Sequence, residues 1–440
     1  MALIRSLTIG ASSLQAHQQR FDVISNNLAN SNTIGYKSSQ ANFVDQLSQT
    51  MKHGRNPDQV GEVGAGGTNP LQYGLGVKMG SVMMDMTQGP IETTNRPLDM
   101  AIQGDGFFIY NMRGQDFYSR AGAVTRDRDG YLIDSASGAY LQGYNVETDA
   151  TGRIMRNTEG RNIINSSMQN IRIESNMISA PAQTQNIRLS GNLNSEAPTG
   201  EARTTSIDIF DNVGGVHTVS LTFTKSANPG EYAVTGEVDG NAVNLSAANI
   251  TFNDDGTVST PNYLDVTAAD LNAALGQQLF DENTPKDISI ELADPNNLLQ
   301  GMTNFAANTS ATIVEKDGFS IGEIIELQVD PEGKIWGSFT NGQSEVLGQL
   351  AIAKFSNQDS LIKEGGNFYS MSPNSGLPNI GTAGDIFPST KIAGNALEQS
   401  NVDLTQEFTE MISTQRAFEA AARTITVSDQ LISETTMLKR

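Results

Sequence analysis

The chain has 440 residues, which is too long for a single hydrophobic core, so roughly two to four domains are expected. Its formal net charge of −21 argues against a nucleic-acid partner, because binding phosphates requires an excess of Lys and Arg. The chain has no cysteine, which excludes disulfides and thiolate metal sites. Its 42 glycines and its low apolar fraction of 38% indicate extended β structure with many turns.

The charge is concentrated in the middle of the chain. Residues 1–60 carry five basic and three acidic side chains, and residues 396–440 carry four basic and seven acidic ones, so 61–395 holds −20 of the total. Near-neutral ends can pack against copies of themselves, whereas a strongly acidic middle repels its copies and stays solvated. This distribution favours a subunit whose ends are enclosed and whose middle faces water.

The N-terminal segment predicts a helix from about residue 2 to about residue 28. Counting in sevens gives a line of large apolar side chains with the spacing of a coiled-coil seam: Leu7, Leu14, Phe21 and Leu28. The helix is expected to end in the asparagine-rich run at 26–32, because short amides compete with the backbone for hydrogen bonds. Since the segment lacks both a membrane-spanning apolar run and a signal-peptide core, we expect neither membrane insertion nor a cleaved leader.

The middle of the chain predicts β structure in two units. The polar, Gly-rich residues 31–80 are expected to form an extended connector. Alternating apolar residues then predict strands in two separate stretches, 81–150 and 313–395, which we assign to one inner β domain. Residues 151–312 are richer in Asn, Ser, Thr and Ala and contain hairpin-like pairs, such as 207–210 with 219–223. We assign 151–312 to a second, outer β domain that is inserted into the first.

The C-terminal segment, 396–440, predicts a second and longer helix. Ser400 followed by Asp403 has the spacing of a capping box, with Asp in place of the usual Glu. The second core position of the heptads is only partly apolar, because it includes Gln415 and Asp429. Polar residues at this position suit a contact among several helices. About 35 residues make a rod of about 50 Å, and a rod with so narrow an apolar stripe needs a partner helix. Counting in sevens gives that stripe: Leu404, Met411, Phe418, Ile425 and Ile432.

The sequence leaves two possible partners for this apolar stripe. The terminal helices could pair with each other inside one protomer, or they could pair with the helices of other copies. Because the N-terminal helix is the shorter one, pairing inside one protomer would leave part of the long stripe in water. The expected fold class is therefore mainly β with α-helical coiled-coil termini: two β domains, one inserted in the other, on a stalk formed by 1–30 and 396–440.

Candidates for chemistry are few. The three histidines, His17, His53 and His217, are far apart in sequence, so we predict no catalytic or metal-binding cluster and no cofactor. The Asp127–Gly130 turn has two aspartates in the manner of a calcium loop, but Ala136 stands where a bidentate Glu belongs, so a hairpin turn is the better interpretation. The Gly64–Gly67 run is not followed by Lys and Ser or Thr, so it does not match a phosphate-binding loop.

Three separate motifs stand out along the chain. The first follows the N-terminal helix, the second lies near residue 104, and the third precedes the C-terminal helix. The motif residues are Asn27, Asn30, Thr33, Gly35 and Tyr36 in the first, Gly104, Gly106 and Phe107 in the second, and Ser400, Asn401 and Asp403 in the third. In this order they resemble the motifs of the bacterial flagellar rod and hook family of axial proteins, and the similar regions cover roughly the first 150 and the last 125 residues.

This resemblance implies a structural, non-enzymatic protein that polymerises with itself. A distal rod subunit would have the same ends around a much smaller insert, so the large 151–312 insert favours a hook subunit. The resemblance then implies an inner tube of terminal helices and a curved polymer that acts as a universal joint between motor and filament, outside the cell. It also implies contacts with rod, hook-cap and hook–filament junction proteins, and export through the flagellar type III apparatus. A different class of protein, a secreted β-rich binding or carbohydrate-active protein that is oligomerised by its helical ends, is the alternative.

Overall fold

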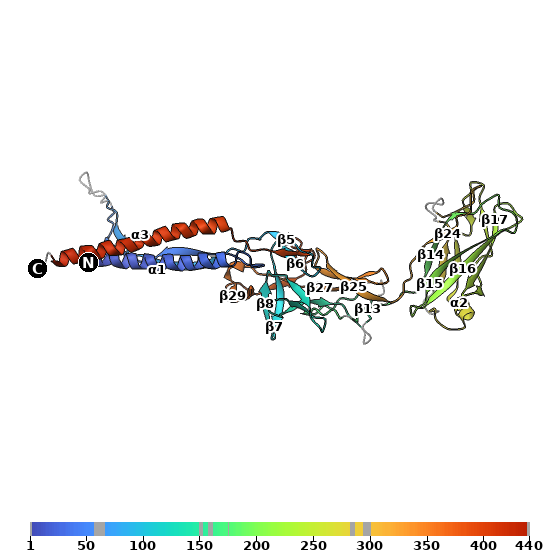
Figure 1. Cartoon of the computed structure of the whole chain (residues 1–440), viewed down its shortest axis with the longest axis horizontal. Helices are drawn as coiled ribbons and strands as arrows, with labels where there is room; N and C mark the ends of the chain where they lie inside the picture. Colours follow the sequence, from blue (N-terminus) through green and yellow to red (C-terminus); the bar gives the residue numbers. More distant parts are fainter. Residues whose placement is uncertain are drawn as a thin grey trace.

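The chain is long and narrow, with its parts arranged in a row. The structure is a computed structural model that describes residues 2–56, 67–148, 153–156, 162–174, 176–281, 287–293 and 301–437. A pair of long helices lies at one end, an inner β body lies in the middle, and an outer β body lies at the far end (Figure 1). Both ends of the chain lie at the free end of the helix pair, so the chain runs out to the outer body and returns. This arrangement confirms the expected fold class.

The two helices run side by side and match the lengths that their heptads predict. Helix α1 spans Ala2–Ala29 and helix α3 spans Leu404–Met437, and the two pack against each other. The expected capping box at the start of α3 is wrong in its register. Asp403 is itself the N-cap, because its Oδ1 accepts hydrogen bonds from the backbone N–H groups of Thr405 at 2.8 Å and Gln406 at 3.2 Å.

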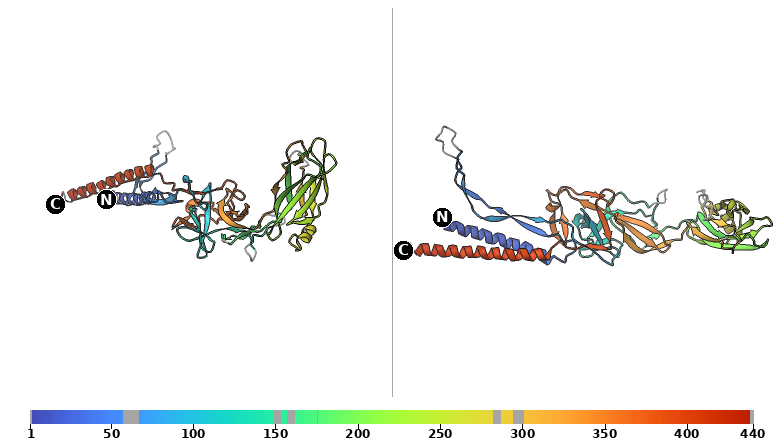
Figure 2. Two further views of the ribbon diagram at one scale, coloured as in Figure 1. Left: turned by 45° about the vertical axis from the view of Figure 1, so that its right-hand side comes forward. Right: turned by 90° about the horizontal axis from the view of Figure 1, so that it is seen from above.

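The segment after α1 is folded back on itself as a two-stranded arm. Strand β1 (Ser39–Asp45) pairs antiparallel with β4 (Val77–Met84) beside α1, and β2 (Ser48–Lys52) pairs with β3 (Leu71–Gly74) further out. Figure 2 shows the arm running along α1 and then turning away from the helices. Much of what reads as an extended connector in the sequence is therefore a paired β ribbon.

The inner body is built from both halves of the chain. Its main sheet has 14 strands, and within it β11 from the first half pairs antiparallel with β27 from the second half. The core lies between them and includes Phe108, Tyr110, Leu141, Ile335 and Leu347. Neither half can bury this core alone. The strands of the first half are β5 (Ile91–Thr93), β6 (Met100–Gln103), β7 (Phe107–Met112), β8 (Gln115–Ser119), β9 (Val124–Arg126), β10 (Leu132–Asp134), β11 (Tyr140–Asn145), β12 (Gln169–Asn170) and β13 (Ile178–Ser179).

The second half of the inner body follows the outer body in sequence and leads directly into α3. It also contains a short 3-10 helix, η2 (Gln358–Ser360). Its last strands pair with strands of the first half, β32 with β6 and β33 with β5, which places the start of α3 beside them. These strands are β25 (Gly322–Val329), β26 (Lys334–Phe339), β27 (Ser344–Leu350), β28 (Ile352–Lys354), β29 (Ile362–Gly365), β30 (Phe368–Ser370), β31 (Asn379–Gly381), β32 (Lys391–Gly394) and β33 (Ala396–Glu398).

The outer body has a hydrophobic core of its own between two sheets. The hairpin of β15 with β16 that the sequence predicts is present, with Phe210 opposite Val216 at its turn. Leu189 and Ile290 from one sheet share the core with Phe223 and Val234 from the other. The elements are β14 (Asn186–Asn192), β15 (Ala202–Phe210), β16 (Val216–Lys225), β17 (Glu231–Val238), β18 (Asn241–Val243), β19 (Asn249–Phe252), β20 (Val258–Thr260), β21 (Tyr263–Val266), α2 (Ala268–Leu275), β22 (Ile288–Glu291), β23 (Met302–Thr303) and β24 (Thr312–Lys316).

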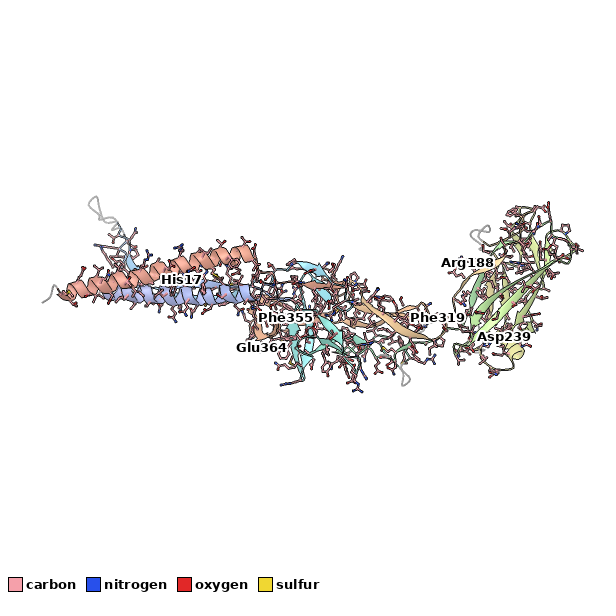
Figure 3. The ribbon with its side chains drawn as sticks, in the orientation of Figure 1. His17, Arg188, Asp239, Phe319, Phe355 and Glu364 are labelled. Carbon is pink, nitrogen blue, oxygen red and sulfur yellow. The ribbon has the colours of Figure 1, made fainter. Side chains whose placement is uncertain are left out.

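A narrow neck joins the two β bodies. The chain crosses it twice, and the two crossings are paired, because Ala182 and Phe319 exchange two backbone hydrogen bonds of 3.1 Å. Phe319, labelled in Figure 3, marks the neck between the inner and outer bodies. The outer body is therefore attached by two chain segments that are joined at a single β-bridge, and it keeps its core separate from that of the inner body.

The aspartate-rich turn at Asp127 is a hairpin turn. The Oδ1 atom of Asp127 accepts hydrogen bonds from the backbone N–H groups of Asp129 at 3.0 Å and Tyr131 at 2.7 Å, and the turn joins β9 to β10. Gly130 has a φ of 87°, a left-handed conformation that favours glycine. Asp127 therefore stabilises a hairpin turn, as the sequence predicts.

Candidate self-assembly site

Small and polar side chains form the seam between α1 and α3. Thr414, Ala421 and Ser428 of α3 are buried there, and the hydroxyl oxygens of Ser428 and of Ser6 in α1 lie 3.0 Å apart. A Cβ atom added to Gly10 would lie only 2.8 Å from the side chain of Ile425, so the two backbones approach closely at this point. Small residues allow two helices to come together without a layer of large side chains between them.

Two polar contacts hold the inner end of the helix pair. Asn27 donates a hydrogen bond of 2.8 Å from Nδ2 to Oε1 of Glu407, and Arg20 forms an ion pair of 3.0 Å with Glu410. Burial raises the pKa of Glu407, and the Asn27 hydrogen bond opposes that rise. The seam is thus closed by small residues along its length and by charged and amide groups at its base.

The predicted heptad stripes lie mostly beside this seam rather than in it. Of the predicted residues, Ile425 packs on Gly10 of α1, and Phe21, Met411 and Phe418 line a groove between the two helices. Phe21, Leu404 and Phe418 are 38%, 45% and 40% exposed. The others are partly buried: Leu7, Leu14, Leu28, Met411, Ile425 and Ile432. Counting in sevens follows one line on each helix, whereas the intramolecular seam follows a neighbouring line of smaller residues.

The exposed apolar surface of α3 is larger than the heptads indicate. Leu404, Phe408 and Ile412, spaced four residues apart, are 45%, 49% and 59% exposed and form what we call the outer stripe. Phe408 and Ile412 do not lie on the predicted heptad line, although their spacing of four residues is a recognisable helical signal. Three further apolar residues of α3 that the heptad count misses are also exposed: Val427, Leu431 and Met437.

A groove lies between the two helices, next to the outer stripe. It has a volume of about 490 Å³, and its apolar lining comes from Phe21, Met411 and Phe418, with His17 at its edge. The ring of His17 packs edge-on against Phe43 of the arm, at 5.5 Å between ring centres. Burial lowers the pKa of His17, and the nearby Arg20 lowers it further. We call this surface the helix groove.

The first family-like motif ties the end of α1 to the arm. The hydroxyl of Tyr36 donates a hydrogen bond of 2.9 Å to Oδ1 of Asn26. The amide of Asn27 pairs with the backbone of Ser39, accepting from its N–H at 2.9 Å and donating to its C=O at 2.8 Å. Asn27 is buried and also contacts Glu407, so a single side chain links α1, the arm and α3.

The rest of this motif closes the turn after α1. Asn30 donates to the C=O of Asn26 at 2.9 Å and accepts from the hydroxyl of Thr33 at 3.2 Å. Gly35 has a φ of 68°, and a Cβ atom there would lie 2.7 Å from the backbone N of Ala121. Only glycine fits this position, because both the backbone conformation and the close approach exclude a side chain.

The motif before α3 meets the same junction from the other side. Asn401 accepts a hydrogen bond of 2.8 Å from the backbone N–H of Ser38 and donates one of 2.8 Å to the C=O of Asp85. Ser400 is buried and accepts from the backbone N–H of Val402 at 3.4 Å, while Asp403 caps α3. Two of the three motifs therefore meet where the helices join the inner body.

A fully buried ion pair lies at the centre of this junction. Lys37 and Glu398 are 2.6 Å apart, and both side chains are 0% exposed. Lys37 also donates to the C=O of Thr87 at 2.6 Å, and Glu398 accepts from the backbone N–H of Gly89 at 2.9 Å. Burial lowers the pKa of Lys37, and the charge of Glu398 opposes that change. No local sequence pattern connects the two residues, because they lie 361 positions apart.

The middle motif lies beneath the ion pair. The C=O of Gly104 accepts a hydrogen bond of 2.8 Å from the buried Arg120. Gly106 has a φ of 142°, and a Cβ atom there would lie 2.6 Å from the side chain of Ile352. Phe107 is fully buried, and its ring lies edge-on to that of Phe355 at 5.9 Å between ring centres. These residues position the inner body against the base of the helices.

Comparison with known proteins identifies the family. The chain is 33% identical over 480 residues to the flagellar hook protein FlgE of Treponema pallidum, and the match covers 100% of both chains. It is 32% identical over 457 residues to the hook protein of Borreliella burgdorferi, covering 99% of this chain and 100% of that one. The chain belongs to the flagellar hook protein family. The hook protein of Escherichia coli is 30% identical over 430 residues, covering 96% of this chain and 97% of its own.

Family models match four segments of this hook-family chain. Residues 7–37 match the flagella basal body rod protein model, and 393–438 match the C-terminal model of the flagellar basal body rod FlgEFG proteins. Residues 101–192 match the D1 domain model of the hook protein FlgE/F/G, and 172–319 match the D2 domain model of the basal body protein FlaE. The sequence interpretation as a hook subunit is confirmed. The chain is a structural, non-enzymatic part of the flagellum and lies outside the cell.

The three histidines of this hook subunit lie in different parts of the chain. His17 lies on the helix pair and His53 in the arm, while His217 bonds to Asp239 of the outer body, which is far from His17 (Figure 3). Within the described ranges, no three metal-ligating side chains are grouped so that they could hold an ion. The helices described here include none that is long and apolar enough to cross a membrane. The Gly64–Gly67 run falls almost wholly outside the described residues.

Proposed function

We propose that neighbouring copies of the chain cover the outer stripe and the helix groove, so that the terminal helices build the inner tube of the hook. The observation that carries this proposal is the nature of the α1–α3 seam. The buried residues of α3 in the seam, Thr414, Ala421 and Ser428, are small, while its large side chains Phe408, Ile412 and Phe418 stay 49%, 59% and 40% exposed. Burying one such large side chain contributes about 1.5–3 kcal/mol, so a few per copy can hold a polymer together.

The predicted heptad residues take part in the same contacts. Leu7, Leu14, Phe21 and Leu28 on α1, and Leu404, Met411, Phe418, Ile425 and Ile432 on α3, lie beside the seam and retain exposed area. Pairing inside one protomer therefore does not use up their apolar surface. The intramolecular and intermolecular partners, which the sequence leaves as alternatives, are both used.

The outer stripe and the helix groove differ in shape and composition. Complementary but different surfaces form head-to-tail contacts, and such contacts build open helical polymers rather than closed dimers. This supports a tube that grows by adding one copy after another. The near-neutral charge of the two helical ends also allows many copies to lie close together around one axis.

The division into parts supports a flexible joint. We assign 1–30 and 396–440 to the inner tube and 31–80 to the connecting arm. The inner β domain comprises 81–182 with 319–395, because β12 and β13 pair with inner-body strands, which moves the boundary from the expected 151 and 312 to the neck, and 183–318 form the outer domain. The apolar helices lie at one end of the row and the acidic outer body at the other (Figure 1). Contacts near the axis of a bending tube move little. Hydrated, charged surfaces far from the axis can slide past one another with little loss of binding free energy. The polymer can therefore bend while it transmits torque from the motor to the filament.

The further partners follow from this role. Rod proteins would contact one end of the polymer, and hook-cap and hook–filament junction proteins would contact the other, all through helical ends like those described here. Export through the flagellar type III apparatus would require an unfolded chain. The terminal helices suit this route, because each exposes apolar surface until neighbours bind it.

Replacing the outer stripe tests the proposal. Serine at all three positions, Leu404, Phe408 and Ile412, is expected to lower the polymer yield at least tenfold while the monomer stays folded, because these side chains contribute little to the protomer. Sedimentation and electron microscopy measure polymer, and circular dichroism measures folding. The matched control is Leu377→Ser, since Leu377 is 84% exposed but lies in an inner-body loop. Normal polymerisation of the triple variant would rule out the outer stripe as an assembly surface.

A further inference from the structure

A buried arginine lies between the inner body and the base of α3. Arg120 is 1% exposed, and its Nη1 atom donates to the C=O of Gly104 at 2.8 Å. The same Nη1 atom lies 3.6 Å from Oε2 of Glu398, which is too long for a good hydrogen bond. Gly104 belongs to the turn between β6 and β7, whereas Glu398 ends β33, the strand that leads into α3. Arg120 therefore makes a good hydrogen bond to the inner body and only a longer contact with the strand that leads into α3.

Two complementary atoms at this point lack partners. Nε of Arg120 and Oε2 of Glu398 are both buried without a hydrogen-bond partner among the described residues. One atom is a donor and the other is an acceptor, and buried groups of either kind are normally paired. Asp105 also attracts Arg120, and the ring of Phe107 lies 5.2 Å from its guanidinium carbon. A small movement of the guanidinium toward Glu398 would bring Nη1 within hydrogen-bond distance of Oε2 and so pair this buried acceptor.

The hydrogen bond from Arg120 to the C=O of Gly104 can break without leaving a buried polar group unpaired. Gly104 is half-buried, so water can replace Arg120 at its C=O. Glu398 is held in place meanwhile, because Lys37 and the N–H of Gly89 bond its other oxygen, Oε1. Arg120 would lose one hydrogen bond to Gly104 and gain one to Glu398, so the free energies of the junction before and after this change should be close.

We infer that Arg120 is a two-position latch that sets the angle between the inner body and α3. In one position it bonds Gly104, as in this structure, and in the other it closes onto Glu398 and draws the base of α3 toward the inner body. The inference rests on the proposed function, in which each copy in a rotating, curved polymer must alternate between extended and compressed states. A packed junction changes between discrete arrangements rather than deforming continuously.

The geometry magnifies a small movement. Helix α3 begins six residues after Glu398 and has 34 residues, which gives a rod of about 51 Å at 1.5 Å per residue. A shift of less than 1 Å at the base therefore displaces the free end of the helix by considerably more. The arginine is the positioning residue, and the buried Lys37–Glu398 pair is the fixed part against which it moves.

Distance measurements between two spin labels test the latch in the dilute monomer, so the result does not depend on polymerisation. The chain has no cysteine, so Gln115→Cys and Arg423→Cys place one label on the inner body and one on α3, both at exposed positions. The native junction is expected to give two distance populations. Glu398→Gln is expected to leave one population, because it removes the charge that attracts Arg120.

Two further variants complete the test. Glu92→Gln makes the same chemical change at an exposed position opposite β33, and it is expected to retain both populations. Arg120→Met removes the guanidinium that makes both contacts, so it too should give one population, and it serves if Glu398→Gln does not fold. A single narrow distance in the native junction would overturn the inference, as would two unchanged populations in both latch variants.

Discussion

Replacing Lys37 by methionine is expected to lower the free energy of unfolding of the inner body and its junction by about 3–5 kcal/mol. The substitution keeps the unbranched shape of the side chain without its ammonium group, and it leaves Glu398 buried at 0% exposure without its closest cation. It also removes the donor to the C=O of Thr87, on the chain segment that enters the inner body from the arm. Breaking one partner of a buried ion pair is strongly destabilising because the other charge cannot return to water.

Urea unfolding followed by tryptophan fluorescence measures this effect. Trp336 is the single tryptophan of the chain and lies in β26 of the inner body, so its signal reports that body directly. The control is Lys363→Met, which removes hydrogen bonds to the C=O of Lys37 and the hydroxyl of Ser39 from an exposed amine. The control should lower the free energy by about 1 kcal/mol. Equal urea midpoints for the two variants would show that the buried pair is not the main support of the junction.

Excising the outer body is expected to leave a folded chain that still polymerises, with altered curvature or stiffness of the polymer. The neck offers a natural cut, because Ala182 and Phe319 are hydrogen-bonded to each other at 3.1 Å and can be joined by a short Gly-Ser linker in place of 183–318. The core of the outer body is separate from that of the inner body, so the inner body should keep its stability. The outer stripe and the helix groove are untouched by the cut.

The change in polymer shape has an electrostatic reason. Residues 183–318 contain 18 acidic and five basic side chains, so the excision removes −13 of the net charge of −21. Less repulsion between neighbours far from the axis should allow closer lateral contacts and a different curvature. Electron microscopy of the purified polymers measures it, with the full chain polymerised in parallel as the control. Failure of the shortened chain to form any polymer would mean that outer-body contacts are needed for assembly itself.

The parts of this fold that could be predicted from the sequence are those set by local patterns. The heptad lines at Leu7 and Leu404 gave both terminal helices, and the alternation at 207–210 and 219–223 gave the hairpin of the outer body. Asp127 was interpreted correctly as a turn residue because the calcium-loop spacing fails at Ala136. Each of these signals lies within a short stretch of chain.

The parts that could not be predicted depend on contacts between distant residues. The arm pairs strands across residues that have no hairpin signal, with Phe43 opposite Met79. The α1–α3 seam uses Gly10 and Ala421, small residues that no hydrophobic count selects. Charged residues are usually exposed, so Lys37 gives no sign in the sequence that it is fully buried. The motif residues are recognisable by resemblance alone, and only the structure shows that they meet at one junction.

Protection of a single cysteine on the outer stripe tests the central claim most directly. Ile412→Cys introduces a thiol into a chain that has none, at a position 59% exposed in the protomer. Asn241→Cys, at an exposed position in the outer body, is the control that should react equally fast in monomer and polymer. If neighbouring copies cover the outer stripe, a maleimide should label Ile412→Cys at least tenfold more slowly in the polymer than in the monomer. Equal labelling of Ile412→Cys in the two states would contradict the account.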